Sequence, residues 1–190
     1  MKTIAKHIIS TFCLALILFA GSPNEAKAQY TEYEIKAGLI LNFARHCVWP
    51  ERMFDRKQNK IILTILGSDP FGEVIENVLR GRSVQGKYYF EVRRASDIRN
   101  LRGSHIIFIS KSERNNIQKI VEYINSFNFK KSAVLTMGDG IDSFCKKGGI
   151  INILEDYTFN VNWDAASDQG VILDNRLLNI ANEIVPTENP

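Results

Sequence analysis

One stretch of this sequence has the residue types of a phosphate-binding loop. Residues 67–72 (Gly-Ser-Asp-Pro-Phe-Gly) follow an apolar run and precede an amphipathic stretch, and backbone amides at such a strand-to-helix junction can hold an anion. Neither the P-loop nor the dinucleotide fingerprint fits, because Glu73 stands where a P-loop continues with lysine and the glycines have a different spacing from the fingerprint. We therefore favour cap and turn chemistry, while Gly67, Ser68 and Asp69 remain candidates for a ligand-binding loop.

A second glycine-bordered loop contains Asp139 and Asp142, which could act as paired carboxylates. Their glycine neighbours favour a simpler interpretation, in which both are turn or cap residues. Gly138 and Asp139 nevertheless follow an expected strand, and open α/β sheets bind ligands at the carboxyl ends of their strands. This loop is therefore the second candidate ligand loop.

The sequence offers few metal ligands or nucleophiles. His46 and Cys47 are adjacent and would point to different faces of a helix, and no C-x-x-C or H-x-x-x-H pair exists, which argues against structural zinc. His105 begins an expected strand and is interpreted as a satisfied histidine at its rim. No G-x-S-x-G elbow occurs, and neither Cys47 nor Cys145 has a histidine placed beside it by an expected element. We expect no metal, no cofactor and no catalytic residue.

Alternating helices and strands must position these residues, as the hydrophobic pattern indicates. Thr31 and Glu34 form a capping box that opens an amphipathic helix ending near Trp49-Pro50. Asp69 is expected to cap the next helix, and residues 157–163 alternate between apolar and polar side chains, as in an antiparallel strand with one covered face. Further helices are expected over 117–124 and 174–185, and further strands over 61–66, 88–93, 105–110, 133–137 and 148–154.

This order of elements predicts the fold class. Strands that alternate with helices indicate an α/β layered sandwich, in which a mostly parallel sheet is flanked by helices. The alternating segment at the end adds an antiparallel C-terminal edge hairpin.

The first 28 residues have the pattern of a cleavable export signal. Lys2 and Lys6 precede an apolar run over 8–20, and Ala26-Lys27-Ala28 fits a signal-peptidase site. Cleavage after Ala28 leaves residues 29–190, which we expect to form a single α/β domain. The apolar run is short for a membrane span and no later stretch approaches the ~20 residues required, so no membrane insertion is expected after cleavage. An uncleaved anchor is the alternative.

The charge of the mature chain excludes one class of partner. Cleavage removes three lysines and Glu25, so the formal charge falls from +3 to about +1. Nucleic-acid binders normally carry a basic face or stripe, whereas here the one arginine cluster, over 93–102, is interrupted by Asp97. We interpret that cluster as a solvated surface and expect no nucleic-acid partner.

Two cysteines remain in the mature chain, Cys47 and Cys145. An exported protein can keep a disulfide, but both residues have apolar neighbours, and free cysteine behaves as a small hydrophobe. A bridge and a pair of buried thiols are about equally compatible with the sequence.

A series of short motifs runs in order from Tyr33 to Val185. They are Tyr33-Glu34-Ile35-Lys36-Ala37, Asn42-Phe43-Ala44, Trp49-Pro50, Leu66-Gly67, Asp69-Pro70-Phe71-Gly72, His105-Ile106-Ile107-Phe108-Ile109-Ser110, Val134-Leu135-Thr136, Gly138-Asp139, Phe144, Gly148-Gly149-Ile150-Ile151, Phe159-Asn160-Val161-Asn162, Leu177-Leu178 and Ala181. Each motif alone is weak, but their combination and order are specific. In these motifs the chain resembles the YfiR family of exported bacterial proteins.

This resemblance implies a periplasmic regulator rather than an enzyme. Its partner would be a membrane-anchored signalling protein, a diguanylate cyclase or a sensor kinase, bound through its periplasmic sensory domain. Release of a cyclase raises cyclic dimeric GMP and favours biofilm growth. Members can form homodimers, and the redox state of their cysteines is linked to folding and function. Here Ser104 replaces a cysteine of many relatives and Cys145 lacks an upstream cysteine, which calls redox control by the family's bridges into question.

The alternating hairpin is the predicted partner surface. Its polar face would reach solvent, and its edge would offer unpaired backbone groups to another chain. The resemblance adds the region around Phe144, although core burial is slightly favoured for that side chain. We therefore expect Phe144, Asp156, Phe159 and Asn162 to bind the partner.

Two other function classes remain open. The chain could be a periplasmic small-ligand sensor that uses the loops after Gly67 and Gly138. It could also be an envelope enzyme whose catalytic residues come from distant parts of the sequence.

Overall fold

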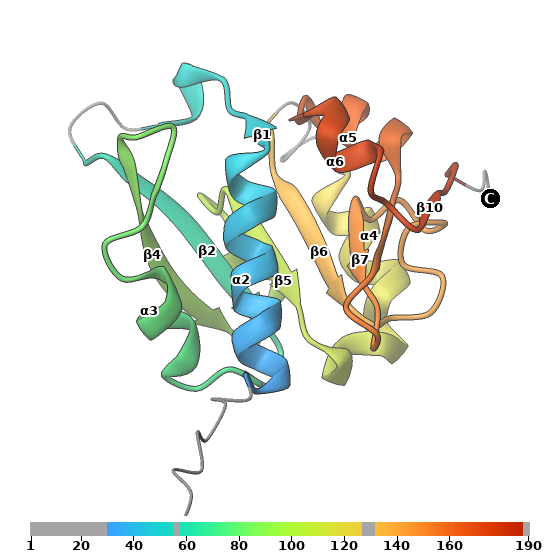
Figure 1. Cartoon of the computed structure of the whole chain (residues 1–190). Helices are drawn as coiled ribbons and strands as arrows, with labels where there is room; N and C mark the ends of the chain where they lie inside the picture. Colours follow the sequence, from blue (N-terminus) through green and yellow to red (C-terminus); the bar gives the residue numbers. More distant parts are fainter. Residues whose placement is uncertain (1–29, 55–57, 127–131, 188–190) are drawn as a thin grey trace, which may run out of the picture. The chain divides into compact units, whose positions relative to one another are not determined.

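The fold is a mixed sheet with helices packed against both of its faces (Figure 1). This computed structural model describes residues 30–54, 58–126 and 132–187. The predicted signal peptide and its cleavage site lie outside the described residues. Residues from Thr31 onward belong to one compact unit, and the following description concerns that unit.

Among the described residues, eight strands form the sheet in the order β10-β8-β7-β6-β5-β2-β4-β3. The neighbours from β7 to β4 are all parallel, β8 is antiparallel to β7, β3 is antiparallel to β4, and β10 is parallel to β8. The strand bounds are β2 Lys60–Leu66, β3 Ser83–Val84, β4 Tyr88–Ala95, β5 Ile106–Ile109, β6 Leu135–Asp139, β7 Ile151–Ile153, β8 Phe159–Val161 and β10 Glu183–Ile184. The predicted α/β class, with a mostly parallel sheet and an antiparallel hairpin, is confirmed.

A second, two-stranded ribbon pairs β1 (Cys47–Val48) with β9 (Ile172–Leu173) in antiparallel register. Three short 3-10 helices complete the connections: η1 Glu51–Met53, η2 Ile98–Leu101 and η3 Lys111–Asn116.

Two apolar cores lie on opposite faces of the sheet. One face is covered by α2 (Glu32–Arg45), α3 (Val74–Leu79), α5 (Trp163–Gln169) and α6 (Asn175–Leu178), and the other by α4 (Ile117–Ile124). Strand β5 shows the division, because Ile106 and Phe108 join the first core while Ile107 and Ile109 join the second. Burial on both faces explains why the central strands are continuous apolar runs.

Helix α2 begins where the sequence predicts. The Thr31 hydroxyl accepts a hydrogen bond from the Glu34 amide (3.3 Å), and the Glu34 carboxylate accepts one from the Thr31 amide (2.7 Å). The helix ends at Arg45 rather than near Trp49-Pro50, because the chain turns into β1. Trp49 folds back, and its indole Nε1 donates to the Ala44 carbonyl (2.9 Å).

Two predicted boundaries near the C-terminus are wrong. The strand over 157–163 is confined to Phe159–Val161, because Asn162 caps α5 through the Ala165 amide (2.8 Å). The closing helix stops at Leu178, and the chain then forms β10 alongside β8. A single helix could not place both Leu177 and Val185, since these side chains lie in cores on opposite faces. Strand β8 is therefore not the edge of the sheet.

Candidate functional site

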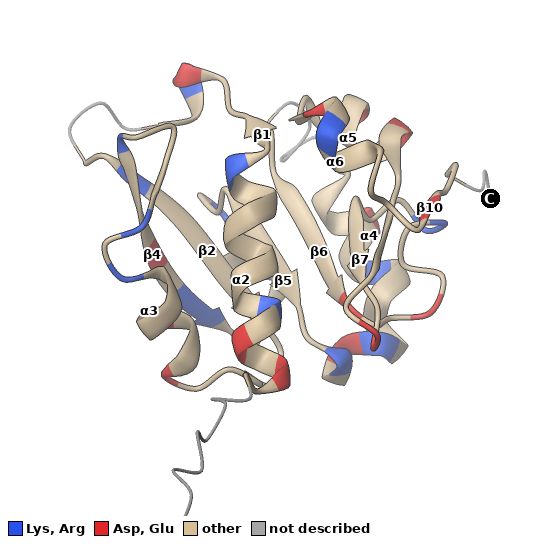
Figure 2. Cartoon of the chain, viewed as in Figure 1, with Lys and Arg blue, Asp and Glu red and all other residues tan. Residues whose placement is uncertain are grey.

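Charged side chains gather at the end of the sheet where α2 begins and β6 ends (Figure 2). At its centre Lys36 of α2 places Nζ 2.6 Å from Oδ1 of Asp139, the last residue of β6. Their side chains are 3% and 2% exposed. Glu32 is a second carboxylate partner of Lys36, also at 2.6 Å. Burial alone would lower the pKa of Lys36, but hydrogen bonds to Asp139 and Glu32 outweigh it, so that pKa lies above its usual value.

This ion pair changes the interpretation of the loop after Gly138. Asp139 neutralises a buried lysine, while Asp142 is exposed, so the two aspartates do not form a pair. The loop borders a polar hollow of about 470 Å³ that also contains Lys111 and Glu155. These two side chains already pair with each other (2.6 Å), and the lining carries both signs of charge.

The turn at Gly67 is held by protein contacts. The Ser68 amide donates to the Ser112 hydroxyl (3.0 Å), and a side chain at Gly67, whose φ is +94°, would collide with Ser112 and Glu113. Asp69 accepts from the Phe71 amide (2.8 Å) and so closes a turn, while α3 begins only at Val74. The expected helix start at Asp69 is therefore wrong, and the amides of this turn do not open a helix.

Phe144 occupies the centre of the loop that connects β6 to β7. Its ring is fully buried and fills the space that Gly138 and Gly149 leave. A Cβ atom on Gly138 would lie 2.8 Å from Cγ of Phe144, and one on Gly149 would overlap the ring. The Phe144 ring thus packs directly against Gly138 and Gly149, a contact that the sequence pattern does not predict.

Two buried amides hold this loop in place. Asn152 accepts from the Ile141 amide (3.1 Å) and donates to the Ile141 carbonyl (2.9 Å). Asn162 donates to the Cys145 carbonyl (2.6 Å) in addition to capping α5. Asn162 is 0% exposed, so its side chain does not reach solvent.

The β7–β8 hairpin separates the remaining predicted partner residues. Asp156 lies in the exposed turn, where Oδ1 accepts from the Thr158 hydroxyl (2.7 Å) and amide (3.1 Å), and these bonds lower its pKa. Phe159 is buried and packs edge-on against Phe43, with ring centroids 4.7 Å apart. Of the four predicted partner residues, three side chains are buried, namely Phe144, Phe159 and Asn162, and Asp156 is exposed.

Both cysteines of the described unit are free and buried. Cys47 lies in the core under α2 and Cys145 in the core on the opposite face, so the sheet separates them. Burial raises the pKa of Cys47 far above its usual range and that of Cys145 to about 12. Such thiols are poor nucleophiles because the thiolate is disfavoured.

His105 is a satisfied structural histidine. Its Nδ1 accepts from the Ile62 amide (3.1 Å), which leaves Nε2 to donate to the Met53 carbonyl (2.9 Å). Burial lowers the pKa of His105, so the ring is neutral near pH 7. The preceding residue, Ser104, shares a 2.7 Å hydrogen bond with the Thr64 hydroxyl.

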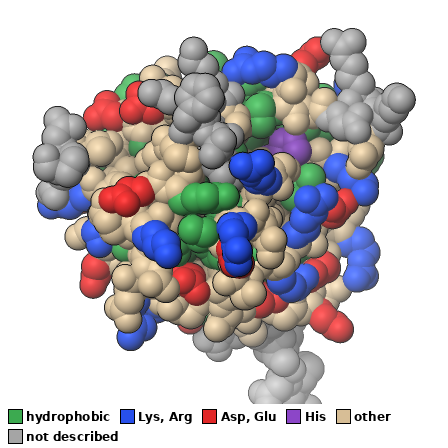
Figure 3. Space-filling model, turned by 180° about the vertical axis from the view of Figure 1, so that it is seen from behind, with side chains coloured by type: hydrophobic (Ala, Val, Ile, Leu, Met, Phe, Trp, Pro, Cys, Tyr) green, Lys and Arg blue, Asp and Glu red, His purple; other side chains and the backbone are tan. Residues whose placement is uncertain are grey.

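Most of the arginine cluster is neutralised by carboxylates. Arg93 pairs with Glu91 (2.7 Å), Arg99 with Asp97 (2.5 Å), and Arg94 with both Asp69 (2.8 Å) and Glu76 (2.5 Å). On the back of the unit, blue basic and red acidic side chains are intermixed (Figure 3). This mixture agrees with the interpretation of the cluster as a solvated surface.

Within residues 30–54, 58–126 and 132–187, no group of three or more His, Cys, Asp or Glu side chains could hold a metal ion. In the same residues, no helix has the length and apolar character needed to cross a membrane.

Lys36, the buried partner of Asp139, was not predicted as a site residue, although the sequence contains a signal for it. Tyr33, Ala37 and Ile40 recur at three- and four-residue intervals and form the apolar stripe of α2. Lys36 lies beside this stripe, three residues after Tyr33 and four before Ile40. A lysine on a core-facing stripe requires a buried counter-charge. The identity of that counter-charge follows only from the fold, since Asp139 is 103 residues away in sequence.

Comparison with known proteins gives one positive result. The sequence model of a family described as YfiR/HmsC-like matches residues 33–182, which include the Lys36 motif, the Phe144 loop and the C-terminal hairpin. No curated protein matches the chain.

Proposed function

Because this chain belongs to the YfiR/HmsC-like family, we propose that it is a periplasmic regulator of a membrane-anchored signalling protein. The partner is a diguanylate cyclase or a sensor kinase, which the regulator binds through the partner's periplasmic sensory domain. Its role is binding rather than catalysis. The signal peptide directs its export to the periplasm and is cleaved after Ala28. Such a protein represses its partner by binding one conformation of the partner's sensory domain more tightly than the other. Equal affinity for the two conformations would leave their equilibrium unchanged.

The observation that carries this proposal is the apolar character of the C-terminal edge of the sheet. Tyr157, Ile180 and Ile184 are 37%, 65% and 55% exposed, and β10 is the last strand on this side among the described residues. We call these three residues, together with Asp156, the C-terminal edge surface. Exposed aromatic and aliphatic side chains beside a free strand edge suit a protein interface.

The loop around Phe144 reaches strands β8 and β10. A hollow of about 100 Å³ lies between this loop and the two strands, lined in part by Phe144, Cys145, Asn160, Glu183 and Val185. We also propose that Phe144, Phe159 and Asn162 support the partner site by holding β8 and β10 in place, Phe159 from the core on one face of the sheet and Phe144 from the core on the other.

The test compares two isoleucines of nearly equal exposure. Ile184 lies on β10, and Ile172, 56% exposed, lies on β9 of the separate ribbon. We expect Ile184→Lys to weaken capture of the signalling protein from envelope fractions by roughly tenfold or more, as for an interface hot spot. Ile172→Lys should bind normally, and thermal unfolding of both variants should match that of the unmodified protein.

Asp156→Lys should weaken capture in the same way. If Ile184→Lys and Asp156→Lys both bind like Ile172→Lys, this edge is not the interface. If the unmodified protein captures no membrane-anchored signalling protein, the proposed function itself is wrong.

A further inference from the structure

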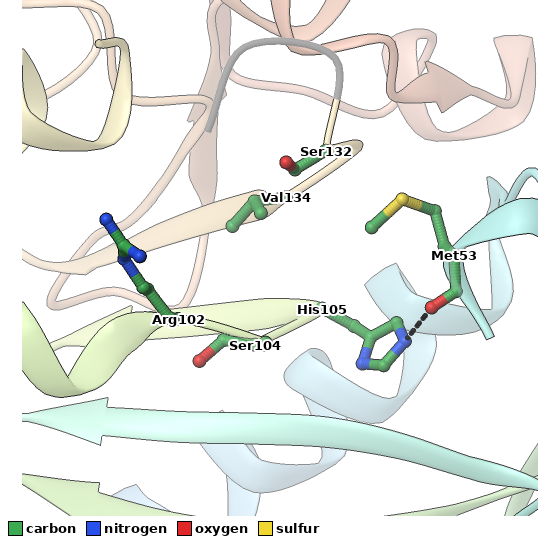
Figure 4. Close-up of a pocket in the computed structure, with 7 residues that line it drawn as sticks. Met53, Arg102, Ser104, His105, Ser132 and Val134 are labelled. Carbon is green, nitrogen blue, oxygen red and sulfur yellow. Dashed lines mark hydrogen bonds between the residues drawn. The ribbon is translucent and has the colours of Figure 1, made fainter. Parts of the chain in front are cut away.

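A pocket (Figure 4) lies beside the residues that precede β5 and β6. It is therefore at the amino ends of these strands, opposite to the loops after Gly67 and Gly138 at the carboxyl ends of β2 and β6. Its volume is about 250 Å³. The loop before β5 contributes Arg102, Ser104 and His105, the segment before β6 contributes Ser132 and Val134, and Met53 of η1 forms the facing wall.

The charge of this pocket is unbalanced. Among the described residues that line it, none is a carboxylate. Arg93, Arg94 and Arg99 are paired with carboxylates. Arg102 is exposed at the rim, and within the described residues it has no hydrogen bond or ion pair. A guanidinium at the rim of a pocket without a counter-charge favours an anionic ligand.

The other polar groups can supplement this cation. Ser132 places a hydroxyl at the pocket (Figure 4). The Ser104 and Thr64 hydroxyls share one hydrogen bond, so one of their two hydrogens remains for another acceptor. Both ring nitrogens of His105 form hydrogen bonds with backbone groups. The His105 ring therefore forms part of the pocket wall and is not expected to bind the anion.

The remaining walls are apolar. Val134 is 1% exposed and Met53 is partly buried against the core, and both side chains face the pocket (Figure 4). An apolar cavity of about 150 Å³ holds benzene, so a pocket of about 250 Å³ has room for a ring and one attached anionic group.

We propose that this pocket binds a small organic carboxylate with a compact apolar group. The Arg102 guanidinium contacts the carboxylate in a bidentate manner, the serine hydroxyls donate to the same oxygens, and Met53 and Val134 contact the apolar group. The site is separate from the C-terminal edge surface, and it does not depend on the proposed regulatory partner.

Benzoate is the test ligand, and its neutral isostere benzamide is the matched control. Calorimetric titration of the purified protein should show saturable binding of benzoate at millimolar concentration, with amide chemical shifts changing at 102–105 and 132–134. Arg102→Gln should weaken binding by about tenfold or more, the loss expected for one charge-assisted hydrogen-bonded pair. Arg99→Gln, in the adjoining 3-10 helix η2 and paired with Asp97, should leave binding within about twofold of the unmodified protein.

Four results would overturn the proposal. Benzoate could fail to bind, benzamide could bind as tightly as benzoate, or the shifts could occur elsewhere in the protein. Inorganic phosphate tests the apolar walls, since binding as tight as that of benzoate would also contradict an organic carboxylate. Ser132→Ala keeps the test decisive if Arg102→Gln does not fold, because loss of this donor should also weaken benzoate binding and leave the unfolding temperature unchanged.

Discussion

At the scale of single residues, the ion pair of Lys36 and Asp139 connects the first turns of α2 to the carboxyl end of β6. Because both side chains are almost fully buried, removal of one leaves the other as an uncompensated charge in the interior. Exposed pairs differ in this respect, since water solvates the remaining partner.

Lys36→Met should therefore lower the free energy of unfolding by about 3–5 kcal/mol, as measured in urea. The combined variant Lys36→Met with Asp139→Leu should recover most of that loss, because apolar replacement of both partners removes the unpaired charge. Lys60→Met, which breaks an exposed pair with Glu91, should cost less than about 1 kcal/mol. If the combined variant is no more stable than Lys36→Met, the unpaired Asp139 charge is not the cause of the lost stability.

His105 makes the stability of the fold sensitive to acid. Its folded-state pKa lies below the ordinary value of 6.5 because the ring is buried, so the unfolded chain binds a proton more readily. This contribution to stability is complete above pH 6.5 and is lost as the pH falls below it.

We expect the free energy of unfolding to fall between pH 7 and pH 5, with a slope of up to about 1.4 kcal/mol per pH unit from this group. His105→Gln should be less stable at pH 7 and should have a flatter profile over the same interval. An equally steep profile in His105→Gln would assign the acid sensitivity to another group.

At the scale of elements, the connection from β6 to β7 behaves as one unit. The Phe144 ring fills the space that the missing side chains of Gly138 and Gly149 leave. The backbone of this connection is held by hydrogen bonds from Asn152 and Asn162. A change at any of these positions is therefore expected to act on the others, in the manner of coupled neighbours.

Gly149→Ala should destabilise the protein by about 1–3 kcal/mol, because the added methyl group overlaps the Phe144 ring. Gly38→Ala is the matched control, since Gly38 lies inside α2 with no atom within 4 Å of the added carbon. That change should stabilise the helix by about 0.5–1 kcal/mol. Phe144→Leu should cost less in the Gly149→Ala background than alone, and equal costs would argue against the shared volume.

The sequence predicts an element well when the order of apolar and polar residues within that element alone shows which of its side chains are buried. Helix α2 and the central strands are of this kind, because the capping box and the apolar runs are local. The C-terminal segment was not predictable in this way, because whether residues 183–184 form helix or strand depends on the neighbouring β8. The candidate site was only partly predictable for the same reason: Phe144 and Asn162 were found as notable residues, but their burial follows from the packing of distant segments.

At the scale of the whole molecule, the two cysteines lie on opposite sides of the sheet. The fold does not require a bridge, since two apolar cores already stabilise it. Counting thiols in the denatured protein should give one free thiol for each of Cys47 and Cys145.

Reductant should leave the thermal unfolding temperature unchanged, and a variant with both cysteines replaced by alanine should still fold cooperatively. A sharp loss of stability in reductant would instead require a bridge between Cys47 and Cys145, and with it a rearrangement of the sheet.

Both ends of the eight-stranded sheet are closed by strands of only two residues, β3 and β10. A strand this short presents too few free backbone groups to template the addition of further chains. The short edge strands therefore protect the sheet against edge-to-edge addition of another chain. The apolar side chains at the β10 edge can remain exposed for recognition without seeding aggregation.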